Sequence, residues 1–352
     1  MATLDFELES FYFEFDNWTY NGSWNYSYSD FDDEWKDESQ LTPPAILAIA
    51  IYVITFLVGT PGNAAVIWVT GCKMKRTVNS VWFLNLAVAD LAYCCSLPFQ
   101  IANIVTRNRW PTDVLLCKLI PSAIVLNMAA SVFLLSAVSV DRCLAITRPI
   151  WSQRWRTVQA ARVACAGAWL LALLMCLPTL LHRSILKYPG WGLSYCSHNY
   201  SQAPFGQRTK QVVEVSRVLV VFALPFLLMA ACYLLIGLKV RRARFAKSHK
   251  PIHLIVVVVV AFFVCWLPYH VFGLLQAFSS HSVALSWDSA AVGLASINSA
   301  LNPILYVFMG RDFRQRFRRS LASSLRFAFS EDLTQSVTSS RLKSRTSIEN
   351  NV

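Results

Sequence analysis

The amino-acid sequence predicts an all-α membrane protein, a seven-transmembrane helix bundle followed by a cytoplasmic amphipathic eighth helix. Hydrophobic residues make up 55% of the chain and charged residues 15%, so a water-soluble fold would lack polar surface to cover itself. Seven apolar stretches are each long enough to cross a bilayer, which takes about 20 residues. Basic residues gather in the short connections between these stretches.

The predicted spans cover roughly residues 44–70, 78–105, 114–147, 160–181, 210–238, 252–278 and 285–309. They define a transmembrane domain at 43–309, between a disordered acidic extracellular N-terminus (1–42) and an amphipathic helix (310–322) that leads into a Ser/Thr-rich cytoplasmic tail (323–352). The first forty residues lack an apolar core with a basic start. We therefore expect no cleavable signal peptide, with the first span acting as the insertion signal.

Charge sets the predicted orientation, because cytoplasmic loops are rich in Lys and Arg. Residues 1–40 hold eleven acidic residues and one basic residue, in a chain whose net charge is +12. Basic clusters follow spans one, three, five and seven, and include Lys73, Arg148, Arg241 and Arg311. These clusters do not line one face, which argues against nucleic-acid binding. We expect a multi-pass protein of the plasma membrane, with the N-terminus outside and the C-terminus in the cytoplasm.

Two modifications agree with this orientation. The glycosylation sequons at Asn17, Asn21, Asn25 and Asn199 all fall in segments assigned to the outside. Cys117 opens span three and Cys196 precedes span five, both in the oxidising compartment, so we expect a disulfide between them.

Polar side chains inside the spans are costly and mark functional positions. They are Asn63, Asp90, Asn127, Ser131, Asn298 and Asn302. One interpretation is hydrogen bonding between helices. The interpretation we favour is that Asp90, with the amides and hydroxyl of Asn127, Ser131, Asn298 and Asn302, holds a sodium ion through oxygen ligands.

Ordered motifs across all seven spans resemble the rhodopsin-like G protein-coupled receptors. They are Gly62-Asn63, Leu86 to Asp90, Asp141-Arg142-Cys143, Trp169, Pro225 with Tyr233, Cys265 to Pro268 and Asn302 to Tyr306. The one departure is Cys143, where many members have Tyr.

The resemblance implies a set of switch residues. Asp141 would neutralise Arg142 at rest, at a site where a G protein docks after release. Pro268 and Pro303 would bend their helices, letting Tyr233 and Tyr306 swing inward. Trp266 would transmit a packing change, which the motif favours over the alternative that its ring only fills space.

Further runs resemble the complement anaphylatoxin receptors, those for component 3a more than those for component 5a. They include Leu116 to Ser122, Asn127 to Ser131, Arg148 to Trp151, Arg244 to Ser248, Ser286 to Asp288 and Phe329 to Thr334. Component 3a receptors carry a very long fourth-to-fifth-span loop, whereas here it runs only from His182 to Lys210. The acidic, Tyr-rich N-terminus also leans toward component 5a.

This resemblance implies a ligand site for a cationic anaphylatoxin that ends in arginine. Arg183 and Arg217 would clamp the terminal carboxylate, because planar guanidinium groups bind carboxylates bidentately. Asp288 would receive the guanidinium, above Tyr269 as a floor. The alternative for each charge is a side chain that reaches interfacial water.

Both termini suggest further partners. Tyr12, Tyr20, Tyr26 and Tyr28 stand among acidic residues, which suits sulfation and attraction of a cationic ligand, or simple disorder. Phe313, Phe317 and Leu321 recur at helical spacing, which indicates a helix on the inner membrane lipids, with no cysteine after it for a palmitoyl anchor. Serines and threonines in the tail suit receptor kinases and arrestin.

The predicted function is a G protein-coupled receptor for component 3a, with inhibitory coupling and chemotaxis implied by the family. Alternatives are a component 5a or related chemoattractant peptide receptor and a decoy without coupling. We find no internal repeat of the kind transporters show, and no nucleophile elbow, metal cluster or phosphate loop, so we predict no enzyme and no cofactor beyond the possible sodium ion.

Overall fold

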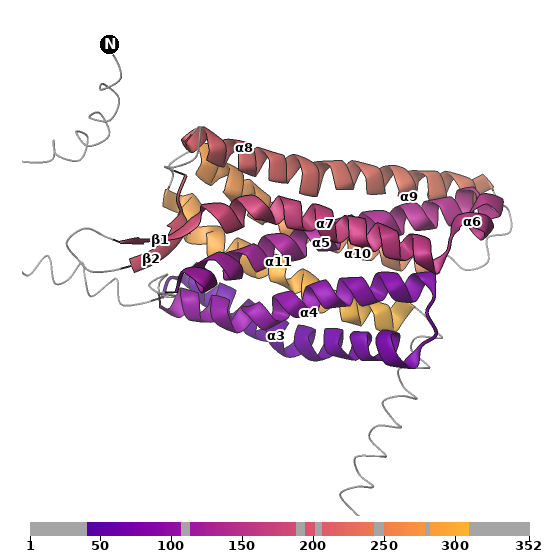
Figure 1. Ribbon diagram of the computed structural model, residues 1–352, viewed down its shortest axis with the longest axis horizontal. Coiled ribbons are helices and arrows are strands. Elements are labelled where there is room, and N and C mark those ends of the chain that lie inside the picture. Colours follow the sequence, from indigo (N-terminus) through magenta and orange to yellow (C-terminus); the bar gives the residue numbers. More distant parts are fainter. Residues whose placement is uncertain are drawn as a thin grey trace, which may run out of the picture. The chain divides into compact units, whose positions relative to one another are not determined.

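The computed structural model describes residues 41–106, 113–187, 194–200, 206–242, 250–278 and 282–309 of the chain. Its helices are α3 (Pro43–Trp68), α4 (Val78–Val105), α5 (Val114–Thr147), α6 (Pro149–Trp155), α7 (Val158–His182), α8 (Gln207–Arg217), α9 (Leu224–Arg242), α10 (Lys250–Phe278) and α11 (Ser282–Met309). Two π-helical segments, η1 (Val69–Lys73) and η2 (Val218–Ala223), extend α3 and join α8 to α9. The long helices run side by side as one bundle (Figure 1).

The bundle has the surface of a membrane protein. Six of the described helical segments are long and apolar enough to span a bilayer, and α11 packs against α3 and α10 as the seventh long helix. Large apolar side chains such as Leu57, Leu170 and Leu234 are 60% exposed or more on the outside. A soluble monomer rarely exposes apolar area on this scale, so hydrocarbon covers these faces.

Two elements were not predicted from the sequence. The segment after span three folds into the short helix α6 (Figure 1). The loop after span four forms a hairpin, in which β1 (Arg183–Lys187) pairs antiparallel with β2 (Ser194–His198). One end of the bundle carries the hairpin and is called the hairpin end. The other end carries α6 and is called the α6 end. The predicted segments 1–40 and 310–352, with the eighth helix, lie outside the described residues.

Local sequence fixes where the helices begin. At α4, Thr77 and Ser80 form a reciprocal capping box, with hydrogen bonds of 2.8 and 3.2 Å. Asp113 caps α5 by accepting a hydrogen bond from the Leu115 backbone N–H at 2.8 Å. Thr157 caps α7 in the same way through Ala160. Each cap satisfies a backbone donor that the first turn leaves without a partner.

A proline accounts for the π-helical segment in the fifth span. Pro225 lies two residues after the end of η2, and it lacks the N–H that would bond back to the Val221 carbonyl. Its ring also crowds that carbonyl, and a widened turn relieves the conflict. The bulge starts at Val218, immediately after Arg217, so it affects the direction in which the Arg217 side chain leaves the helix.

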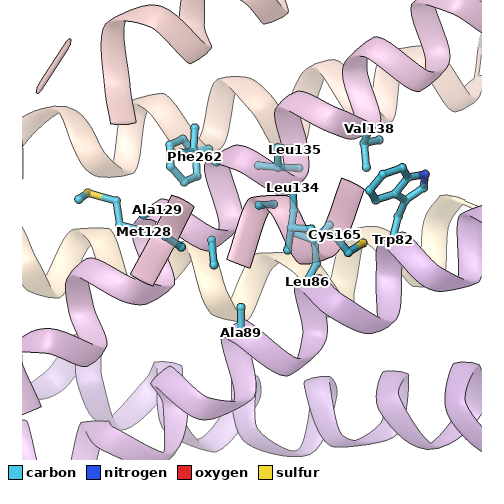
Figure 2. Packing of buried hydrophobic residues seen from close by; sticks show 14 of the residues in the cluster. Trp82, Leu86, Ala89, Met128, Ala129, Leu134, Leu135, Val138, Cys165 and Phe262 are labelled. Carbon is cyan, nitrogen blue, oxygen red and sulfur yellow. The ribbon is translucent and has the colours of Figure 1, made fainter. Parts of the chain in front are cut away.

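The core lies where α4, α5, α7 and α10 meet (Figure 2). Trp82 and Leu86 of α4 pack with Met128 and Leu134 of α5 and with Phe262 of α10, all less than 5% exposed. Cys165 contributes a small buried side chain from α7. This packing holds the helices at fixed rotations, so the same polar side chains always face the interior.

Candidate functional site

Charged side chains from four elements gather at the hairpin end. Arg183 opens β1, Arg217 ends α8, Tyr269 lies in α10 and Asp288 lies in the first turns of α11. The Cys117–Cys196 disulfide, predicted from the sequence and confirmed here, ties β2 to the start of α5. We call these four residues, with Glu214, the charge cluster.

Arg217 is the most completely bonded member of the charge cluster. Its side chain is 4% exposed, and its Nη1 donates to both Glu214 carboxylate oxygens at 2.8 Å. The same nitrogen donates to the Tyr269 hydroxyl at 3.2 Å, and Nη2 donates to Thr179 Oγ1 at 3.3 Å. An isolated buried charge would be very costly, and the Glu214 carboxylate compensates it here.

Arg183 keeps hydrogen-bonding capacity. Its Nη1 lies 3.9 Å from Cys196 Sγ, and its Nε is buried with no hydrogen-bond partner among the described residues. Burial lowers the pKa of Arg183, while Tyr269 and Asp288 act electrostatically in the opposite direction. Asp288 in turn accepts a hydrogen bond from Gln276 and feels the Arg183 charge. The two arginines and the aspartate therefore share one electrostatic environment.

His198 adds no third positive charge beside these arginines. His198 of β2 stacks on Tyr200 with ring centroids 5.5 Å apart, and its Nδ1 lies 3.5 Å from the Tyr200 hydroxyl. Burial first, and then the charge of Arg183, lower the pKa of His198 to about 2. The imidazole is neutral at physiological pH and forms part of the wall around Arg183.

Sequence reasoning missed Glu214, Thr179 and Gln276. A signal for Glu214 was present, since it precedes Arg217 by three residues and such pairs face each other on a helix. Glu214 also approaches Gly273 of α10, where an added Cβ would lie 3.0 Å from Glu214 Oε2. No pattern in the sequence pointed to Thr179 or Gln276, because their partners lie in other helices.

The mid-bundle residues predicted from their polarity do come together. Asn127 Nδ2 donates to one Asp90 oxygen at 3.1 Å, and Asn302 Nδ2 donates to the other at 2.6 Å. Ser299 joins them by donating to Asn127 Oδ1 at 3.4 Å. Asp90 and Asn302 are fully buried.

The donor set also suits a hard cation. Ser131 Oγ and Asn302 Oδ1 are buried oxygens without a hydrogen-bond partner among the described residues, and Asn298 Nδ2 is likewise unpaired. Oxygen ligands around one carboxylate are what sodium prefers. Asn63 lies apart, because its Nδ2 donates to Gly59 O and Ser299 O, both at 2.9 Å.

At the α6 end, Asp141 and Arg142 are in contact, but each forms its shorter hydrogen bonds with another residue. Arg142 Nε lies 3.9 Å from Asp141, whereas Arg156 donates to both Asp141 oxygens at 2.8 and 3.0 Å. Arg142 and Arg156 each donate to Asn79 Oδ1, at 2.6 and 2.7 Å. Sequence reasoning did not foresee Arg156 or Asn79 as partners.

The other proposed switch residues lie between these two ends. Trp266 is fully buried, with its ring 5.6 Å from Tyr269 and 6.0 Å from Phe262. Tyr233 of α9 points toward α5, its hydroxyl 3.2 Å from Ser139 Oγ. Pro268 lies within α10 and Pro303 within α11. Tyr306 belongs to α11, but its side chain is outside the described part of the structure.

The predicted modification sites are mostly outside the described residues. Asn17, Asn21 and Asn25, and Tyr12, Tyr20, Tyr26 and Tyr28, fall in that undescribed N-terminal segment. Asn199 follows β2, and its backbone N–H donates to the His182 carbonyl at 2.7 Å.

Comparison with known proteins identifies the class. The family described as 7 transmembrane receptor (rhodopsin family) matches residues 62–306. The chain belongs to this family, and it is a multi-pass membrane receptor and no enzyme.

Particular relatives narrow the identification to the anaphylatoxin chemotactic receptors. The chain is 44% identical to the C3a anaphylatoxin chemotactic receptor of Oncorhynchus mykiss over 294 residues, 82% of this chain and 80% of the relative. It is 41% identical to the C5a anaphylatoxin chemotactic receptor 1 of Oryctolagus cuniculus over 298 residues, 83% of this chain and 85% of the relative. With the C3a receptor of Cavia porcellus the identity is 34% over 441 residues, 85% of this chain and 93% of the relative.

Proposed function

We propose that this receptor binds the C-terminal arginine of the anaphylatoxin C3a in the charge cluster and activates a heterotrimeric G protein, of the inhibitory class, for chemotaxis. The observation that carries the proposal is the joining of the buried Arg217, the half-buried Arg183 and the half-buried Asp288 at the hairpin end. A C-terminal arginine presents one carboxylate and one guanidinium, and it complements this arrangement in both charges.

The roles of the individual residues follow from their charges and from the hydrogen-bond donors that have no partner in the free receptor. Arg183, with its unpartnered Nε, and Arg217 receive the carboxylate. Asp288 receives the guanidinium, and Tyr269 forms the floor that already touches Arg217. A ligand without its terminal arginine would leave these charges buried and unmatched, which is why the site rejects it.

Glu214 acts as an internal counter-ion in the free receptor. Its two oxygens occupy Arg217 Nη1, so the ligand carboxylate must displace or share them. The exchange replaces one ion pair with another inside the cavity. A displaced Glu214 carboxylate then needs a new partner, because it pairs with Arg217 in the free receptor.

The choice of C3a over C5a rests on the stronger likeness to a C3a receptor, 44% against 41% identity. The Oncorhynchus mykiss C3a receptor aligns over 294 residues, without the long extension of the 441-residue alignment to Cavia porcellus. A short fourth-to-fifth-span connection is therefore compatible with a C3a receptor. C5a remains the second candidate ligand.

Contacts along α10 provide a route from ligand to G protein. Displacing Arg217 from Tyr269 alters the packing of Trp266 and Phe262 one and two turns further along. We place the hairpin end outside the cell and the α6 end in the cytoplasm, where Arg142 would meet the G protein once released from Asn79 and Asp141. Sodium bound at Asp90 through Asn127, Ser131, Asn298 and Asn302 would stabilise the resting arrangement between the two ends.

The remaining proposed partners act through segments outside the described structure. Sulfated tyrosines and glycans would lie in the N-terminal segment, and receptor kinases and arrestin would act on the Ser/Thr-rich tail.

The deciding experiment measures calcium or cyclic-nucleotide signalling in cells that express this chain. The cells are challenged with C3a, C5a and each fragment stripped of its terminal arginine. We expect a response to intact C3a alone, weakened at least thirtyfold in Arg217→Ala and Asp288→Ala, about 2 kcal/mol or more for an unpaired buried charge. Arg208→Ala, at an exposed position on α8, is the matched control.

Other outcomes would change the assignment. A response to C5a alone would replace the ligand, and surface binding without any signal would mark a decoy. Equal responses to intact and stripped fragments would rule out the terminal-arginine site.

A further inference from the structure

A groove of about 330 Å³ lies at the α6 end, separate from the charge cluster and from Asp90. Helices α4, α5, α7 and α9 form its walls, through apolar side chains that include Trp82, Val140, Leu144, Ala161, Ala164 and Leu228. Alanines on the α7 face leave the space, because larger side chains there would fill it. Of the residues assigned a function above, Asp141 lines this groove, and no ligand has been assigned to it.

The groove opens outward, toward the membrane. Ala161 at its base is 3% exposed, whereas Leu228 at its side is 45% exposed and Ala164 is exposed as well. The outer surfaces of α7 and α9 beside it carry exposed leucines such as Leu171 and Leu227. An apolar cavity that opens onto a lipid-covered face is filled by hydrocarbon rather than by water.

Helix α6 forms the mouth of the groove at the depth of the lipid headgroups. Trp151 and Trp155 line the groove one turn apart, with ring centroids 6.4 Å apart, and they are 48% and 57% exposed. Tryptophan rings favour the boundary between headgroups and hydrocarbon. The groove therefore leads from headgroup level into the acyl region of the leaflet at the α6 end.

Two exposed arginines lie beside the groove in sequence, next to its lining tryptophans but not among its lining residues, and we call them its rim. Arg148 and Arg154 are exposed on α6 or directly before it, and the Arg154 guanidinium lies 5.9 Å from the Trp155 ring. Among the described lining residues, Asp141 is the one acid, and Arg156 already neutralises it. The two exposed arginines thus have no acid of the groove as a partner, and they attract an anion at headgroup depth.

We propose that this groove binds one acyl chain of an anionic phospholipid, whose phosphate contacts Arg148 and Arg154 while the chain lies between Val140, Ala164 and Leu228. The apolar wall selects the chain and the basic rim selects the headgroup. Arg156 lines the same groove and holds Asp141, so the bound lipid touches the network that includes Arg142. This inference is independent of the ligand proposed above.

Native mass spectrometry of the full-length chain tests the proposal, with receptor released from nanodiscs of phosphatidylcholine mixed with phosphatidylserine. We expect wild-type receptor to retain one phosphatidylserine. Ala164→Trp should lose it, because the indole occupies the groove. Val163→Trp should keep it, because Val163, the residue before Ala164 on α7, is 63% exposed and does not line the groove. Arg154→Gln should lower the preference for phosphatidylserine about fivefold, the equivalent of about 1 kcal/mol for one basic residue near anionic lipid.

Controls keep the test decisive if one variant folds poorly. Thermal unfolding and peptide binding check each variant, and Ala160→Phe blocks the same groove from one turn earlier on α7. Loss of the lipid in both blocking variants, with its retention in Val163→Trp, supports the site. Equal retention in the blocking variants and Val163→Trp would overturn it, as would wild-type receptor that retains phosphatidylcholine as readily as phosphatidylserine.

Discussion

Single residues in this receptor show how buried charge is managed by local pairing. Arg217 is held by a carboxylate, a phenol and a threonine hydroxyl, all within 3.3 Å. Arg183 lacks such a set, since its Nη1 lies 3.9 Å from Cys196 Sγ, whereas Nε is without a hydrogen-bond partner in both arginines within the described part of the chain. The two arginines therefore differ in how readily they can bind a new anion. Arg183 is open to a new anion, whereas Arg217 must first exchange Glu214.

The exchange at Arg217 is testable with one substitution. Glu214→Gln removes the negative charge that competes with the ligand carboxylate, so a peptide ending in arginine should bind about tenfold more tightly. This is near the lower limit of about 1.5–3 kcal/mol for a hydrogen bond to a charged group. Radioligand competition measures the change. The same peptide with an amidated C-terminus should show no gain, and a gain for both peptides would contradict the exchange.

Asp90 is the centre of the proposed sodium site, and sodium binding there can be tested. Sodium bound there should stabilise the wild-type receptor by about 1.4 kcal/mol when sodium is at about ten times its dissociation constant. The thermal unfolding temperature should thus be higher in sodium chloride than in choline chloride of equal concentration, and Asp90→Asn should abolish the difference. Thr70→Val is the control, because Thr70 is also buried but bonds within its own helix at 2.7 Å. A sodium effect that survives Asp90→Asn would exclude this site.

Among the elements, α3 and α11 approach each other through small residues. A Cβ on Gly293 would lie 3.2 Å from the Ala48 backbone, and one on Gly62 would lie 2.9 Å from the Pro303 ring. Small residues allow such close packing in membrane helices, where apolar burial gives no driving force between helices. The position of α11 beside α3 depends on them. That position brings Asn302 to Asp90.

Gly293→Leu should destabilise the receptor through this contact. A leucine meets backbone atoms that cannot move aside, and overpacking of this kind costs about 1–3 kcal/mol. Tryptophan fluorescence during thermal unfolding measures the loss. Gly167→Leu on α7 is the matched control, because a Cβ there has nothing within 4 Å. Equal unfolding temperatures for the two variants would show that the α3–α11 contact tolerates bulk.

The whole molecule has two chemically distinct ends, at which we propose the ligand site and the G-protein site. The disulfide and the hairpin lie at one end, and α6 with Arg142 and Arg156 lies at the other. The orientation of these ends in the cell is a property of the entire chain, because the charges on all connections act together.

Glycan attachment reports that orientation. In a receptor whose Asn17, Asn21 and Asn25 are all changed to Gln, Asn199 should still carry a glycan, because its sequon lies beside β2 at the hairpin end. Treatment with a glycosidase should shift the electrophoretic mobility of this receptor. Asn199→Gln should remove the shift, and Ser201→Ala, which breaks the same sequon, should do likewise. A chain that carries glycans only in sequons engineered near α6 would have the opposite orientation.

Some features of the molecule could be predicted from the sequence because they depend on local composition. The predicted spans 78–105 and 114–147 coincide with α4 and α5, since apolar length and the caps Thr77 and Asp113 are encoded within a few residues. The Cys117–Cys196 disulfide followed from sidedness. Asp90, Asn127 and Asn302 were identified because any polar group in hydrocarbon needs a partner.

Only the tertiary structure decided which groups pair. Asp141 bonds most closely to Arg156 rather than to its neighbour Arg142, and Arg217 is matched by Glu214. The groove beside α6 also appears only when α4, α5, α7 and α9 meet. The physical reason is that the length and polarity of a helix are properties of its own residues. Its rotation and its distance from neighbours are set by packing across the whole bundle, and pairing depends on those.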